Sequence, residues 1–80
     1  MPTEQIGEYE IEYEGVWLAD VQAWAAFVTI YGPSPNPMHR HSVLPRQQVA
    51  VETVFDNEQQ AQAEARQAAM TMLEHAHGAH

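Results

Sequence analysis

The side chains best suited to chemistry in this sequence are basic, and they fall into two short stretches. The stretch MHRHSVLPR (38–46) and residues 75–80 together contain all five histidines and two of the three arginines: His39, Arg40, His41, Arg46, His75, His77 and His80. Neutral imidazole nitrogens bind Zn²⁺, Ni²⁺ or Cu²⁺. Because His39 and His41 stand two apart in an extended loop, their rings would point the same way. A divalent-metal site built from the five histidines is therefore one prediction.

The same loop has a second and a third interpretation. Arg40 and Arg46 could contact phosphate, nucleic acid or another anion, or they could simply neutralise the carboxyl end of a neighbouring helix. No Asp or Glu occurs between residues 21 and 51, although the whole chain carries a formal net charge of −8. Nucleic-acid-binding proteins neutralise phosphates with Lys and Arg, and this chain has no Lys. We therefore do not expect nucleic acid to be the main partner.

Recognisable catalytic motifs are missing from the sequence. Ser42 adjoins His41, but nucleophilic catalysis needs a base and an orienting acid that the fold places around the nucleophile. The sequence has neither a glycine-rich phosphate-binding loop nor an HExxH motif. We predict a protein that is not an enzyme and needs no cofactor, with zinc, nickel or copper as the alternative.

Three segments have the patterns of strands. Residues 7–18 include EYEIEYE, in which tyrosine and isoleucine alternate with glutamate, as in a half-buried strand. Residues 22–31 are apolar on both faces and rich in aromatic and β-branched side chains, which favours a central strand. A proline-rich loop over residues 32–45 then leads into a third strand over residues 46–55.

Residues 57–76 have the pattern of a helix. Asp56 or Asn57 can cap its start, and one stripe recurs at spacings of three and four residues, formed by Ala61, Ala65, Ala68, Ala69, Met72, Leu73 and Ala76. The expected fold is α+β, a single domain over residues 1–80. It has an antiparallel three-stranded meander in the order 1-2-3, with one C-terminal helix packed on one face. The helix and the third strand would both be about 30 Å long, so all five histidines should lie at one end of the molecule.

One helix can cover only one face of such a sheet. The other face should then present four neighbouring side chains, Phe27, Tyr31, Ala50 and Val54, beside a stripe of glutamates. An uncovered apolar patch of this kind indicates a surface for protein interaction or self-association.

The end of the last strand, Phe55-Asp56-Asn57, followed by an alanine-rich helix, resembles small bacterial proteins of unknown function that place a three-stranded sheet before one helix. The topology is also similar to the latter part of double-stranded-RNA-binding domains. Such domains carry a lysine-rich motif at the start of the final helix. The matching stretch here, Asn57-Glu58-Gln59-Gln60, has no lysine, so no RNA-binding residue carries over.

The rest of the composition indicates the cellular compartment of the protein. The chain has no cysteine, its first residues lack the basic and apolar regions of a signal peptide, and its longest apolar run is too short to span a membrane. We expect a cytoplasmic, acidic protein without a membrane partner. The predicted function is a non-enzymatic protein-interaction module, with self-association through the open sheet face as one form of it.

Overall fold

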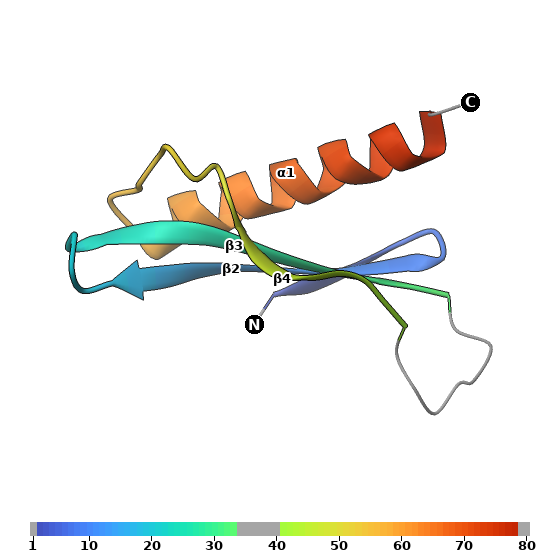
Figure 1. Ribbon diagram of the computed structural model, residues 1–80, viewed down its shortest axis with the longest axis horizontal. Coiled ribbons are helices and arrows are strands. Elements are labelled where there is room, and N and C mark those ends of the chain that lie inside the picture. The colour runs from blue at the N-terminus through green and yellow to red at the C-terminus, as the bar shows by residue number, and fades with distance from the viewer. Residues whose placement is uncertain (1, 34–40, 79–80) are drawn as a thin grey trace.

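The computed structural model describes residues 2–33 and 41–78, with the backbone alone at residues 41 and 76–78. Four antiparallel strands form one sheet in the order β1-β2-β3-β4, and one C-terminal helix lies across one face of it (Figure 1). The elements are β1 (Thr3–Ile6), β2 (Tyr9–Leu18), β3 (Ala23–Gly32), β4 (His41–Val49) and α1 (Glu58–Gly78). The predicted α+β class, the antiparallel sheet and the C-terminal helix are confirmed, but the sheet has four strands and not three.

The additional strand, β1, precedes the first predicted one. Ile6 pairs with Tyr9 across the two residues Gly7 and Glu8, and Gly7 has a φ of 60°, as the first central position of a tight type II′ hairpin turn requires. The predicted strand over residues 7–18 was therefore wrong at its start. The segment TEQI has a single apolar residue, so it carries no periodic signal of its own.

The last strand lies earlier in the chain than residues 46–55, and the loop over residues 32–45 is correspondingly shorter. β4 already begins at His41, and Pro45 lies inside it. A proline is tolerated here because β4 is an edge strand and its pairing with β3 is irregular. After Val49 the chain turns: Ala50 has a φ of 52°, and the Thr53 amide donates to the Ala50 carbonyl at 2.9 Å.

The helix begins where its capping residues predict. The Gln60 amide donates to Oδ1 of Asn57 at 2.8 Å, which makes Asn57 the N-cap and satisfies one of the unpaired amides of the first turn. The helix continues to Gly78, slightly beyond the predicted end. Within residues 2–33 and 41–78, α1 does not combine the length and the apolar character that crossing a membrane requires.

The core lies between α1 and the facing side of β2, β3 and β4. Its buried side chains are Ile11, Ala26, Val28, Ile30 and Val49 from the sheet and Ala65, Ala69 and Leu73 from the helix. Gly15 on β2 allows the close approach of the helix, since a Cβ there would lie 2.8 Å from the Glu58 carbonyl oxygen and 3.0 Å from Cβ of Ala61. The predicted stripe of α1 is confirmed for Ala61, Ala65, Ala69 and Leu73, which are buried, and the side chain of Ala76 lies outside the described ones.

Candidate binding face of the sheet

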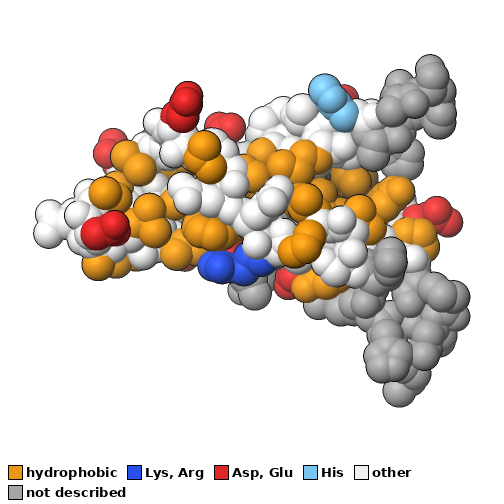
Figure 2. All heavy atoms as spheres, viewed as in Figure 1, with side chains coloured by type: hydrophobic (Ala, Val, Ile, Leu, Met, Phe, Trp, Pro, Cys, Tyr) orange, Lys and Arg blue, Asp and Glu red, His pale blue; other side chains and the backbone are white. Residues whose placement is uncertain are grey.

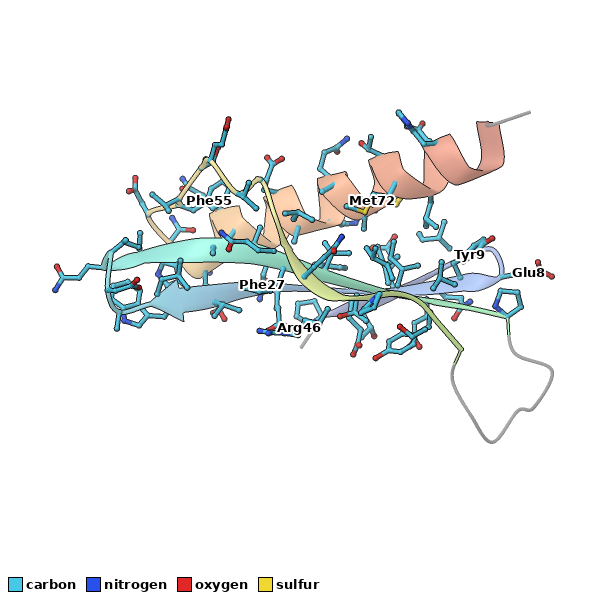
Figure 3. All side chains as sticks on the ribbon, in the orientation of Figure 1. Glu8, Tyr9, Phe27, Arg46, Phe55 and Met72 are labelled. Carbon is cyan, nitrogen blue, oxygen red and sulfur yellow. The ribbon has the colours of Figure 1, made fainter. Side chains whose placement is uncertain are left out.

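The sheet has a second face, opposite α1, on which polar and aromatic side chains meet. Residues directly opposite each other in β2 and β3 point to the same side, so the pairs Glu12–Thr29 and Glu14–Phe27 alternate with core residues such as Ile11 and Val28. The pair Tyr31–Ser42 continues this side toward β4. Figure 3 shows Arg46 on the side of the sheet away from α1, and Met72 on the side of α1. We call this side the open face.

Arg46 links three strands on the open face. Its guanidinium Nε and Nη2 donate to the two carboxylate oxygens of Glu14, at 3.2 and 3.0 Å. Its Cζ lies 4.4 Å from the centre of the Phe27 ring, a distance typical of a cation–π contact. The hydrogen bonds from Arg46 to Glu14 raise the pKa of the guanidinium. The arginine of β4 thus reaches over the aromatic ring of β3 to the carboxylate of β2.

Beside this contact the open face is hollowed. A shallow depression of about 550 Å³ is lined by Glu12, Glu14, Thr29, Tyr31, Ser42, Pro45 and Arg46. The lining combines two carboxylates, three hydroxyl groups, one guanidinium and two rings, all from the middle and edge of the sheet. Irregular pairing between β3 and β4 at Val28–Ile30 and at Ile30–Tyr31 bends the edge strand at this place.

Glu12 and Thr29 are polar side chains of the depression that lack partners among the described residues. Thr29 is only 7% exposed, and neither its hydroxyl nor the Glu12 carboxylate makes a hydrogen bond or ion pair there. No buried side-chain nitrogen or oxygen of the described residues is left without a partner. The Thr29 hydroxyl oxygen has no partner among these residues, so it must be exposed to solvent within the depression. The depression can therefore supply polar contacts to a bound molecule.

No protein-family model, curated protein or solved structure matches this chain. The resemblance to double-stranded-RNA-binding domains and to small bacterial sheet–helix proteins stays a prediction from topology.

The predicted interaction surface is divided by the structure. Phe27 and Tyr31 lie on the open face, both partly buried, with Phe27 beneath Arg46. Ala50 and Val54 do not extend this surface as a strand would, because they follow the end of β4. The sequence predicts a strand as far as residue 55, but β4 ends at Val49, where the positive φ of Ala50 turns the chain.

A separate apolar surface was missed by the sequence patterns. Four large hydrophobic side chains that are at least half exposed belong to the β2–β3 turn region and the segment after β4: Trp17, Val21, Val51 and Val54. These segments come together because the backbone of Trp24 pairs with that of Phe55. The ring of Trp24 also packs edge-on against the ring of Trp17, with 5.6 Å between the ring centroids. Figure 2 shows hydrophobic side chains along the whole of the visible face, this end included. We call these four residues the apolar end. The alternating pattern of a strand does not predict it, because its residues come from two separate segments.

The basic stretch and the histidines lie largely outside the described residues. His39, Arg40 and His80 fall outside them, and His41 and His77 have backbone only, while His75 is exposed on α1. Among the described residues, no three His, Asp or Glu side chains are placed to hold a metal ion. The metal site therefore stays a prediction. Of the two anion-contact candidates, Arg46 already pairs with Glu14.

The third arginine belongs to the opposite side of the sheet. Arg66 of α1 donates through Nε and Nη2 to the carboxylate of Glu4 on β1, at 2.7 and 3.0 Å. These hydrogen bonds are the main reason why the pKa of Glu4 is lowered. The pair ties the short first strand to the helix.

Proposed function

We propose that this protein is a non-enzymatic binding module whose open face contacts a positively charged segment of another protein. The observation that carries the proposal is the depression on the face that α1 leaves uncovered, where Glu12 and Thr29 lack partners among the described residues. Concave surfaces that combine rings with a few polar groups are the usual form of a recognition site.

Charge supports a basic partner rather than a second copy of the chain. At a formal net charge of −8, two copies repel each other at long range, whereas a partner rich in Arg or Lys is attracted and steered to the surface. The glutamates of β2 place part of this negative charge on the open face.

Self-association is a second candidate, favoured by the apolar end. Its segments expose a half-exposed tryptophan and three exposed valines, and large exposed hydrophobic side chains that lie together mark protein contact surfaces. The two candidates respond oppositely to salt. Screening weakens the attraction of a basic partner, but it relieves the repulsion between two acidic copies.

The direct test uses a fluorescent peptide of five Arg-Gly repeats as the basic partner, with its anisotropy followed at low and high NaCl. Two variants with the same change in charge distinguish the surfaces: Glu12→Lys on the open face and Glu64→Lys on the exposed side of α1. We expect Glu12→Lys to weaken binding at least tenfold more than Glu64→Lys, on the order of one charged hydrogen-bonded contact. Equal weakening by both variants would show that the attraction is general and the open face has no special role.

Sedimentation velocity at rising protein concentration tests the second candidate. Association that grows with salt and is abolished by Trp17→Ser would assign it to the apolar end. A monomer at every concentration and salt would remove it. Divalent-metal binding by the histidines, anion binding by the 38–46 stretch and a cytoplasmic location remain predictions beside this proposal.

A further inference from the structure

We propose that the depression on the open face is a binding site for one arginine side chain of the partner, formed by the Glu12 carboxylate, the Tyr31 ring and the Thr29 hydroxyl. We call it the arginine site. This inference rests on the proposed function and names the chemistry that the open face would recognise.

The protein contains an example of the same recognition within its own fold. Arg46 is held by two hydrogen bonds to Glu14 and by the face of the Phe27 ring. Glu12 lies two residues from Glu14 on the same side of β2, which is a displacement of about 7 Å along the strand. The depression therefore also brings a carboxylate and an aromatic ring together, with Tyr31 diagonal to Glu12 where Phe27 is directly opposite Glu14.

The lining is matched in charge to one added cation. Its two carboxylates and its one guanidinium leave one net negative charge. Arg46 and Glu14 already neutralise each other, so the remaining charge belongs to Glu12, which has no ion-pair partner among the described residues. A single guanidinium would balance it.

The floor of the depression provides the second polar contact. Thr29 stands directly opposite Glu12, is more than nine-tenths buried and has a hydroxyl without a partner in the described part of the chain. A guanidinium offers five N–H donors, so it can donate to both oxygens of Glu12 and still reach an additional acceptor. Lysine offers a point charge without this planar fork, so arginine should bind more tightly.

The experiment compares three capped tripeptides, Gly-Arg-Gly, Gly-Lys-Gly and Gly-citrulline-Gly, by NMR titration of ¹⁵N- and ¹³C-labelled protein. Citrulline keeps the shape of arginine but has no charge. We expect arginine to bind more tightly than lysine, and citrulline to bind at least about tenfold more weakly than arginine. The largest shifts should occur at the Glu12 carboxylate and at the amides of Thr29 and Tyr31.

Matched variants locate the contact. Glu12→Gln should weaken the arginine peptide about tenfold, whereas Glu64→Gln, with the same charge change on α1, should leave its affinity unchanged. Thr29→Val, close in shape, should weaken it by a smaller factor, and this variant replaces Glu12→Gln as the test if the latter fails to fold. Equal affinities for the arginine and citrulline peptides, or an unchanged affinity of the variants for the arginine peptide, would contradict the proposed arginine site.

The experiments distinguish a wrong arginine site from a wrong proposed function. The Arg-Gly repeat peptide could bind Glu12→Lys more weakly than Glu64→Lys while the affinities of the tripeptides stay unchanged in Glu12→Gln and Thr29→Val. In that case the open face binds a basic partner, but not through the arginine site. If the repeat peptide does not distinguish the two lysine variants, both proposals are wrong.

Discussion

Arg46 reaches from β4 across β3 to Glu14 on β2, with its Nη2 3.0 Å from the carboxylate Oε1. The stretch of the chain that has no acidic residue thus supplies a cation to the strand that is richest in glutamate. The same guanidinium covers Phe27, the aromatic side chain that would otherwise be the apolar centre of the open face. The open face is therefore better suited to recognising charge than to burying a large apolar patch.

Replacing Arg46 by Met should keep an aliphatic side chain over Phe27 while removing the ion pair. The pair is partly exposed, with side-chain exposures of 52% for Arg46 and 19% for Glu14, so we expect a loss of only about 0.5–1 kcal/mol. A double-mutant cycle with Glu14→Gln, measured by urea unfolding, should give a coupling of similar size. A coupling of zero would mean that the contact contributes nothing in solution.

Gly15 should resist substitution because of where the helix lies. The Cβ of Gly15→Ala would fall 2.8 Å from the Glu58 carbonyl oxygen, so the first turn of α1 must move away at a cost of about 1–3 kcal/mol. Ala63→Ser is the control, because it also adds a single atom, on the exposed side of α1, and should change stability by no more than about 0.5 kcal/mol. If both variants unfold at the wild-type urea midpoint, α1 does not approach β2 as closely as described.

The two sides of α1 should differ in their tolerance of leucine. Ala65 is fully buried against the sheet, so Ala65→Leu should overpack the core and cost about 1–3 kcal/mol. Ala63→Leu makes the same change on the exposed side and should alter stability by less than about 0.5 kcal/mol. Thermal unfolding of both variants measures the difference, and the reverse order would mean that the other side of the helix faces the core.

The pair between Glu4 and Arg66 should make part of the stability depend on pH. Hydrogen bonds from Arg66 lower the pKa of Glu4 in the folded protein below its ordinary value of 4.5. This contribution is therefore present above the unfolded pKa and is lost as pH falls through the lowered, folded pKa. The urea midpoints of wild type and Arg66→Met should differ at pH 7 and converge below about pH 4. A difference that stays constant down to pH 2 would assign the effect of Arg66 to something other than Glu4.

Regular patterns in the sequence predicted the regular parts of the fold. Alternation along β2 and the spacing of Ala65 and Ala69 report which side chains face the core, the apolar run of β3 reports a central strand, and the structure places them so. These signals are strong because each repeats over several residues of one element.

Features that depend on contacts distant in sequence were not predictable in this way. β1 owes its place to pairing with β2, since its own residues are mostly polar. The early end of β4 depends on the backbone of Ala50, which no neighbouring glycine or proline announces. The depression needs Glu12, Thr29 and Ser42 from three strands to meet, and their spacing along the chain does not reveal it.

The most direct test of the open face as the binding surface is a backbone amide shift map of ¹⁵N-labelled protein titrated with the Arg-Gly repeat peptide at physiological salt. We predict that the shifted amides belong to the strands around the depression, with Glu12, Thr29, Tyr31 and Ser42 among them, while the exposed side of α1 near Glu64 stays unshifted. Shifts spread equally over the sheet and the helix, or centred on α1, would contradict the claim that the open face recognises a basic partner.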